Sequence, residues 1–171
     1  MLDSSSAPPH GRFVLSVGDT APDFEGTDQN GRRVKLDELL EKSAVVLYFY
    51  PKDFTPVCTA QACLFRDSSA ELTGAGVQVI GVSGDDQSSH SRFAETHRVP
   101  YPLLSDPDKN IQKAYEARQL LGLLAKRVTY VIGRDKKIRG VFHHELSAQK
   151  HVDAVKKVLA SMNAYSGSHS S

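Results

Sequence analysis

The sequence is poor in cysteine, in net charge and in long apolar runs, and each shortage excludes a class of protein. Two cysteines among 171 residues are too few for a closed tetrahedral zinc site of the usual kind. A net charge of +1 gives no electrostatic reason to expect nucleic acid or an anionic membrane surface as a partner. No apolar run approaches the roughly 20 residues of a membrane-spanning helix.

The first residues also lack the positive start and apolar core of a secretory signal. Without an export signal we predict a cytoplasmic protein, in which two cysteines are expected to be redox-active or catalytic instead of a structural staple. Residues 1–12 are rich in Ser and Pro and are predicted to be a disordered tail. The ordinary composition of the remainder predicts one domain over 13–164, followed by a flexible polar tail at 165–171.

Strand and helix patterns alternate along the chain. The expected elements are, in order, a hairpin turning at Asn30-Gly31, a short helix capped by Asp37, a strand at 44–50, a helix at 57–72, a strand at 77–83, a helix at 89–97, an extended stretch at 101–105, a helix at 107–117, strands at 128–132 and 137–142, and a helix at 147–162. This order is the thioredoxin layout. We therefore predict an α/β fold in which helices flank a central mixed sheet, with an N-terminal β-hairpin and an insertion at about 101–126.

Both cysteines lie in one stretch, YPKDFTPVCTAQAC, at 50–63. Cys58 falls in the first turn of the helix after a central strand, at the sheet edge where chemistry gathers in open α/β folds. The unpaired amides and partial positive charge of a helix N-terminus stabilise an anion, and thiolate is the nucleophile that attacks peroxide oxygen. Thr55 can hydrogen-bond the sulfur or the attacked oxygen, while Pro51 and Pro56 restrict the turn. The alternative is that Cys58 packs as a small, inert hydrophobe.

Cys63 follows Cys58 by five residues, a spacing that does not suit a disulfide within an intact helix. Five residues of α-helix place two Cα atoms about 8–9 Å apart, whereas a disulfide needs Cα atoms within roughly 7 Å. If the two cysteines bond, the first helical turns must unwind on oxidation and refold on reduction. The alternative is that Cys63 is simply a core-facing helical residue.

The segment PKDFTPVCTAQAC resembles the peroxidatic loop of peroxiredoxins, whose signature is Pro-x-x-x-Thr/Ser-x-x-Cys. A second Cys five residues later resembles the peroxiredoxin Q branch, also called bacterioferritin comigratory protein and described as atypical 2-Cys. The similarity extends through VGDTAPDF, YFYPKDFTPVCT, GVSGD, YPLLSDPDK and KRVTYVIGRDKKI. This resemblance implies an antioxidant thiol peroxidase that reduces hydrogen peroxide and organic hydroperoxides and needs no cofactor or metal.

The resemblance also implies a role for each matching residue. Cys58 matches the peroxidatic cysteine, which peroxide oxidises to sulfenic acid, and Cys63 matches the resolving cysteine that closes an intramolecular disulfide. Thr55 matches the hydroxyl that orients thiolate and peroxide, and Pro51 the proline that shields the sulfenic acid from water. Arg127 matches the arginine whose guanidinium holds both thiolate and peroxide.

The resemblance further implies that thioredoxin, or sometimes a glutaredoxin, reduces the disulfide. Because resolution within one chain needs no second subunit, we expect a monomer, with a dimer as the alternative. Two other functions remain open. A general disulfide oxidoreductase is opposed by the absence of Cys-x-x-Cys, and a thiol-based redox sensor or holdase would use the same thiol as a signal.

Three residues depart from the pattern of the family, and two weaker signals lie elsewhere in the chain. Phe54 and Val57 replace residues of the Asp-Thr-Pro-Gly-Cys form common in this branch, and they predict a stiffer, more apolar loop. Gln61 stands where many relatives carry Glu and is assigned no catalytic role. The run at 120–124 is predicted to be buried or to face another subunit. The histidines are interpreted as solvated instead of metal-binding, namely His143, His144 and His151.

Overall fold

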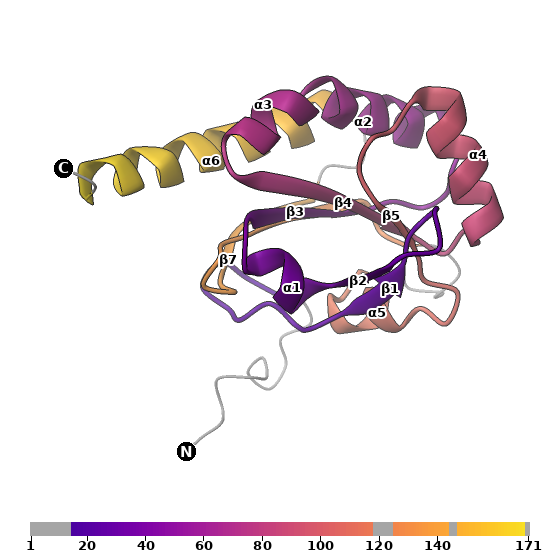
Figure 1. The fold of residues 1–171 in the computed structure, drawn as a ribbon, viewed down its shortest axis with the longest axis horizontal. Helices are drawn as coiled ribbons and strands as arrows, with labels where there is room; N and C mark the ends of the chain where they lie inside the picture. Colours follow the sequence, from indigo (N-terminus) through magenta and orange to yellow (C-terminus); the bar gives the residue numbers. More distant parts are fainter. Residues whose placement is uncertain (1–14, 118–124, 144–146, 170–171) are drawn as a thin grey trace, which may run out of the picture.

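The computed structural model describes residues 15–117, 125–143 and 147–169 (Figure 1). In chain order its elements are β1 (Glu25–Thr27), β2 (Arg33–Lys35), α1 (Leu36–Leu40), β3 (Ala44–Phe49), α2 (Pro56–Asp67), α3 (Ser69–Gly74), β4 (Val77–Ser83), α4 (Gln87–His97), β5 (Leu103–Ser105), α5 (Asn110–Ala114), β6 (Val128–Ile132), β7 (Ile138–Phe142) and α6 (Ala148–His169). The predicted tail at 1–12 and the run at 120–124 lie outside the described residues.

The described strands form one mixed sheet in the order β2-β1-β5-β4-β3-β6-β7. Strand β3 pairs in parallel with β4 and antiparallel with β6, and β4 pairs in parallel with β5. The predicted hairpins are present as β1–β2 and β6–β7. Because β3, β4 and β5 run in the same direction, their carboxyl ends meet at one edge of the sheet, and the loops that follow them lie together there.

Strand β3 divides the core into two layers, because successive side chains of a strand point to opposite faces. Val45, Leu47 and Phe49 pack under α1 and α5, whereas Val46 and Tyr48 pack under the larger helices. Figure 1 shows α2, α3, α4 and α6 over one face of the sheet, with α1 and α5 on the other. The predicted α/β thioredoxin-like layout is therefore confirmed, including its N-terminal hairpin.

The helix predicted at 57–72 is two helices in the structure. Helix α2 ends at Asp67 and α3 starts at Ser69, with Ser68 between them at φ −94° and ψ −1°. The sequence at the break is Asp-Ser-Ser, and these short polar side chains compete with helical hydrogen bonds for the backbone. The apolar period continues across the break, because Phe65 and Leu72 both face the same core, so periodicity alone did not reveal it.

The predicted capping of α1 by Asp37 is wrong. The helix begins at Leu36, its N-cap is Lys35, and Asp37 lies in its first turn. Burial decides this start, because the Leu36 side chain is fully buried and its N–H donates to the Phe24 carbonyl at 3.1 Å. The Asp37 carboxylate instead pairs with Lys136 at 3.0 Å.

Two further helix boundaries differ from the predicted ones. Helix α5 is shorter than the range 107–117, because the Asp106 carboxylate accepts from the N–H groups of Ile111 and Gln112 and organises the preceding residues as a turn. Helix α6 continues to His169, into the segment predicted to be a flexible tail at 165–171. That segment contains no proline, so its polar composition alone does not end the helix.

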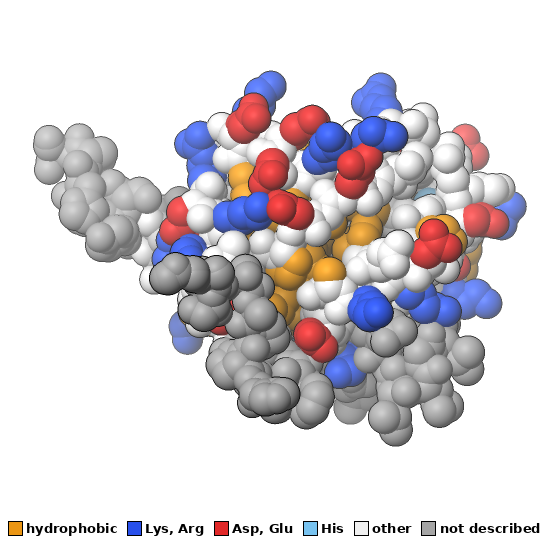
Figure 2. Space-filling view, turned by 90° about the horizontal axis from the view of Figure 1, so that it is seen from below, with side chains coloured by type: hydrophobic (Ala, Val, Ile, Leu, Met, Phe, Trp, Pro, Cys, Tyr) orange, Lys and Arg blue, Asp and Glu red, His pale blue; other side chains and the backbone are white. Residues whose placement is uncertain are grey.

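The surface of the described residues carries charges of both signs. Figure 2 shows basic and acidic side chains interspersed around an apolar strip on the face that carries α1 and α5. This mixture agrees with the net charge of +1. Among the described helices, none has both the length and the apolar composition needed to cross a membrane.

Candidate active site

Cys58 is the third residue of α2 and is almost completely buried, with 1% of its surface exposed. Pro56 opens the helix, where its missing N–H would have had no helical partner. The first helical hydrogen bond near this end runs from the Thr59 N–H to the Thr55 carbonyl at 2.8 Å. The sulfur therefore lies in the first turn, where free amides and the helix dipole favour an anion, as the sequence predicted.

Arg127 reaches this sulfur because of the strand register. In the antiparallel pair of β3 and β6, Phe49 lies opposite Val128, so the residue before β6 lies beside the chain that leaves β3. The Arg127 side chain is buried, and its Nη1 donates to the Cys58 Sγ at 3.3 Å. A permanently charged, planar guanidinium at this distance stabilises a thiolate.

Gln61 is a site residue that the sequence reasoning missed. It is fully buried, and its Oε1 accepts from Arg127 Nη1 at 3.2 Å, so the same nitrogen binds both the amide and the sulfur. Its Nε2 has no hydrogen-bond partner among the described residues. Gln61 follows Cys58 by three residues, and this spacing places both side chains on one face of the helix, a signal that was available in the sequence.

Thr55 and Pro51 lie in the loop that joins β3 to α2. The Thr55 hydroxyl donates to the Lys52 carbonyl at 2.9 Å, so the contact between this hydroxyl and the sulfur stays a prediction. A hydroxyl that donates in this way keeps its lone pairs available to accept a hydrogen bond. Pro51 is half-buried and, with Lys52 and Gly84, lines a cavity of about 180 Å³.

Cys63 is also in α2, and its side chain is half-buried. Both cysteines are free thiols in this structure, and the helix between them is unbroken. The separation expected for five helical residues therefore applies, and a bond between the two sulfurs requires α2 to unwind. The Ala62 carbonyl in the same turn accepts from the Tyr101 hydroxyl at 3.0 Å, a bond that unwinding would break.

An aromatic layer lies beneath α2. The Tyr48 ring stacks on Phe65 with 4.9 Å between ring centroids and contacts Tyr50 at 5.4 Å. Burial raises the pKa of Tyr48 well above its ordinary value, and the neighbouring Tyr101 and Tyr50 raise it further. The Tyr48 hydroxyl therefore stays neutral near the sulfur, and the fixed positive charge of Arg127 is not offset by a tyrosinate.

The histidines predicted to be solvated differ in their surroundings. His143 is exposed, as expected, and His144 lies outside the described residues. His151, however, is fully buried and lies 2.7 Å from the Thr129 hydroxyl through its Nδ1. His151 lies on the side of α6 that faces the core. The sequence around it is polar and does not indicate this burial.

Together, the geometry supports nucleophilic chemistry by one sulfur. The Cys58 Sγ is buried at a helix N-terminus and bonded to an arginine that is itself held by Gln61. The same guanidinium can stabilise negative charge that develops on an oxygen under attack. A second thiol lies further along the same helix.

Comparisons with a family model, with curated relatives and with solved structures all indicate the same family. The model of the AhpC/TSA family matches residues 17–141. "Peroxiredoxin Q, chloroplastic" of Gentiana triflora is 43% identical over 148 residues, covering 86% of this chain and 68% of the relative. The protein of the same name from Arabidopsis thaliana is 44% identical over 146 residues, covering 85% and 67%. The crystal structure of peroxidoxin BcpB from Mycobacterium tuberculosis has a TM-score of 0.79 and 40% identity, covering 88% of this chain and 97% of that one.

The predicted cytoplasmic location is wrong by this comparison, because both plant relatives are named as chloroplastic proteins. The prediction rested on a missing secretory signal. Compartment is read from targeting segments that contribute nothing to the folded domain, so the features that specify the fold and the site carry no information about it.

Proposed function

Since the chain belongs to the AhpC/TSA family and is a thiol peroxidase of the peroxiredoxin Q type, we propose that Cys58 attacks the peroxide and Cys63 resolves the product. The family uses a peroxide as substrate and a thioredoxin-type reductant. The observation that carries the assignment is the 3.3 Å bond from Arg127 Nη1 to the buried Cys58 Sγ. A small inert thiol would have no need of this buried cation.

In the first step, the Cys58 thiolate attacks one peroxide oxygen, and the O–O bond breaks. The sulfur becomes a sulfenic acid, and the other oxygen takes a proton and leaves as water or an alcohol. Arg127 holds the thiolate and stabilises the charge on the departing oxygen. The Thr55 hydroxyl accepts from the peroxide and orients it, and Pro51 limits access of water to the sulfenic acid.

In the second step, the Cys63 sulfur attacks the Cys58 sulfenic acid, releases water and forms an intramolecular disulfide. This step requires α2 to unwind, because the two residues lie in one continuous helix. A reduced dithiol of the thioredoxin type then attacks the disulfide through a mixed disulfide and returns both thiols. Thioredoxin is the first reductant to test and glutaredoxin the second, and a monomer completes the cycle without a partner subunit.

The first test is a steady-state assay of the variant Cys58→Ser. With thioredoxin, its reductase and NADPH, hydrogen peroxide should drive NADPH consumption by the unmodified protein. The variant should lose at least about a thousandfold in rate, because a hydroxyl at this position is not an effective nucleophile toward peroxide. Full activity in a correctly folded Cys58→Ser protein would refute the assignment. Oxidation of Cys58 in the unmodified protein without any NADPH consumption would instead favour the redox-sensor alternative.

The second test separates resolution from the first oxidation. Cys63→Ser should consume one equivalent of peroxide per chain, accumulate the Cys58 sulfenic acid and then stop with thioredoxin alone. An added small thiol should restore turnover, because it can attack the sulfenic acid from solution. Sustained turnover of this variant with thioredoxin alone would show that Cys63 is not the resolving residue.

A further inference from the structure

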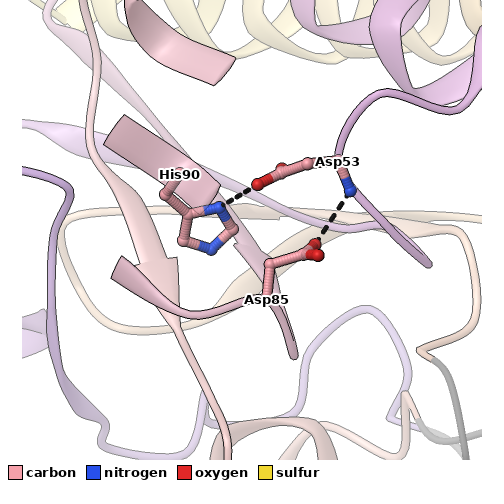
Figure 3. A group of neighbouring side chains, drawn as sticks. All are labelled: Asp53, Asp85 and His90. Carbon is pink, nitrogen blue, oxygen red and sulfur yellow. Dashed lines mark hydrogen bonds and ion pairs between the residues drawn. The ribbon is translucent and has the colours of Figure 1, made fainter. Parts of the chain in front are cut away.

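Three ionisable side chains cluster beside the loop that carries the site (Figure 3). Asp53 comes from that loop, between Pro51 and Thr55, while Asp85 follows β4 and His90 lies on α4. Asp53 and His90 are only 3% and 0% exposed. Charges held this far from water are costly unless they are paired and hydrogen-bonded, so the partners of each atom show which form the group takes.

The Asp53 carboxylate accepts three hydrogen bonds. The Tyr50 hydroxyl donates to Oδ1 at 2.6 Å, and the Ser89 hydroxyl donates to Oδ2 at 2.8 Å. The Nδ1 of His90 lies 2.7 Å from Oδ2. In addition, the Asp53 backbone N–H donates to Asp85 Oδ2 at 2.8 Å. The middle of the loop is thus bound to the end of β3, to α4 and to the turn after β4.

The surroundings of His90 indicate that its ring carries two protons. Nε2 lies 3.1 Å from the Leu104 carbonyl oxygen, which can only accept, and Nδ1 faces the Asp53 carboxylate. The hydroxyl groups of Tyr50 and Ser89 donate to Asp53 and so stabilise its charged form over the neutral acid. This geometry favours placing the proton between Asp53 and His90 on the ring, which makes the two residues a buried ion pair.

The same groups have the ligand atoms of a cation site, all within 4.8 Å of one another. Their hydrogen bonds oppose that use. Asp85 Oδ2 already accepts from the Ser83 hydroxyl at 2.6 Å and from the Asp53 N–H, and a doubly protonated ring cannot bind a metal. Asp85 is instead a second negative charge near the ring. Tyr50, 3.4 Å from His90 Nδ1, stays neutral, because burial and then Asp53 raise its pKa well above the ordinary value.

We propose that the Asp53–His90 ion pair holds the Cys58 loop folded, and thereby sets the balance between attack on peroxide and formation of the Cys58–Cys63 disulfide. The inference rests on the proposed function, because it assumes that the loop and α2 must open for Cys63 to react. In the folded loop the His90 ring has its counter-ion. When the loop withdraws Asp53, the ring is left as an unpaired buried charge, which opposes opening. Asp53 and His90 are therefore positioning residues that act through the loop.

The first experiment measures the charge of His90 directly, in the unmodified, reduced protein. Nitrogen NMR of the imidazole, assigned with the variant His90→Asn, should show both ring nitrogens protonated at neutral pH. A neutral ring under these conditions would overturn the proposal. The measurement involves no peroxide, so its outcome does not depend on whether Cys58 is the reactive residue.

The second experiment measures the two chemical steps separately. After one equivalent of hydrogen peroxide, rapid quenching with an alkylating agent and mass spectrometry give the rate of disulfide formation. Asp53→Asn should raise that rate about tenfold or more, as expected for losing a hydrogen bond between charged groups. In a Cys63→Ser background, the same substitution should slow sulfenic acid formation, because less of the protein has the folded loop.

Two comparisons show whether the pair itself is responsible. His90→Asn should shift both rates in the same direction, and the double variant with Asp53→Asn should add little, because either change alone breaks the pair. The matched control is Asp86→Ala, which removes the N-cap bond to the Ser89 N–H of the same helix and should leave both rates unchanged.

Unchanged rates in Asp53→Asn, additive effects in the double variant, or an equal effect of Asp86→Ala would each overturn the proposal. If the unmodified protein formed no disulfide at all, the proposed function would fail instead. The NMR result would then still decide whether Asp53 and His90 form the buried ion pair.

Discussion

Arg127 contacts the Cys58 sulfur through one nitrogen of a rigid group. Its Nη1 donates to Cys58 and also to Gln61, so the orientation of the guanidinium is fixed before any peroxide arrives. A lysine would carry the same charge on a flexible chain without the planar arrangement of donors. Replacing Arg127 by lysine therefore separates the effect of the positive charge from the effect of the guanidinium geometry.

We expect Arg127→Lys to reduce the second-order rate constant of Cys58 with hydrogen peroxide by about a hundredfold, the usual loss when one directed donor to a developing oxyanion is removed. Competition against a peroxidase of known rate gives this constant. The control is Arg139→Lys, an exposed arginine paired with Asp135, which should have no effect. A rate loss below threefold would show that the guanidinium geometry is unimportant.

Phe54 replaces a residue of the common loop sequence, and its backbone and contacts show the structural effect of that replacement. Its backbone takes a left-handed conformation with φ 66°, which costs a residue with a side chain about 1–2 kcal/mol. Phe54 is 48% exposed, but its ring packs edge-to-face on Phe93, with 5.1 Å between ring centroids. Phe54 therefore gives the loop an apolar contact with α4, close to Asp53 and His90.

The residues that the sequence identified differ in kind from those it missed. Cys58 and Arg127 were named through a specific loop motif and a family resemblance, and the structure places them in contact. Asp53 and His90 carry no local signal, because their contact joins residues 37 positions apart. A lone Asp in a turn and a lone His in a helix are ordinary until the fold brings them together.

At the scale of elements, the break at Ser68 separates α2 from α3 and would confine any unwinding of α2 to the residues before it. Helix α2 contains both cysteines, whereas α3 starts beyond the break and packs Leu72 into the core. Separate helices need not melt together, because each has its own hydrogen bonds and its own packing. The sequence predicted one helix here and so could not indicate where unwinding would stop.

We predict that oxidation to the disulfide removes amide-exchange protection from the first turns of α2 and leaves α3 protected. Hydrogen exchange with mass spectrometry on the reduced and oxidised forms would resolve the two helices. The Cys63→Ser variant, oxidised to its sulfenic acid, is the control and should retain the reduced pattern. Equal protection of α2 in both forms would mean that the two sulfurs meet without unwinding.

The positions of the long strands along the chain were the most predictable part at this scale. Long apolar runs gave β3, β4 and β6 with nearly correct ends, because full burial on both faces leaves a strong sequence pattern. The ends of α1 and α5 were predicted less well. Those boundaries are set by a buried Leu36 and by Asp106 hydrogen bonds, neither of which is visible in hydrophobic periodicity.

At the scale of the whole molecule, buried tyrosines lie in both core layers of the described residues. The buried ones are Tyr48, Tyr50, Tyr101, Tyr115 and Tyr130. Burial is the first cause that raises the pKa of each above the ordinary value of 10.0. The folded chain therefore keeps their protons at alkaline pH, where the unfolded chain would lose them.

We predict that the free energy of unfolding falls steeply above about pH 10. Below that pH both states bind the tyrosine protons and stability is unaffected. Above it the unfolded state binds fewer protons, and each buried tyrosine lowers stability by about 1.4 kcal/mol per pH unit. Urea denaturation over this range would measure the slope, with tyrosinate absorbance as the control for ionisation. A stability that stays constant well above that pH would contradict the burial of these hydroxyl groups.

The tyrosines beneath α2 have another consequence, because the chain contains no tryptophan. Tyrosine therefore dominates the intrinsic ultraviolet emission. The Tyr48 and Tyr101 hydroxyl groups are joined by a 2.8 Å hydrogen bond, and the Tyr101 hydroxyl also donates to the Ala62 carbonyl. Opening of α2 would break these hydrogen bonds and change the environment of both tyrosine rings. If the disulfide forms by opening of α2, as proposed, tyrosine emission would report that step in stopped flow without any attached dye.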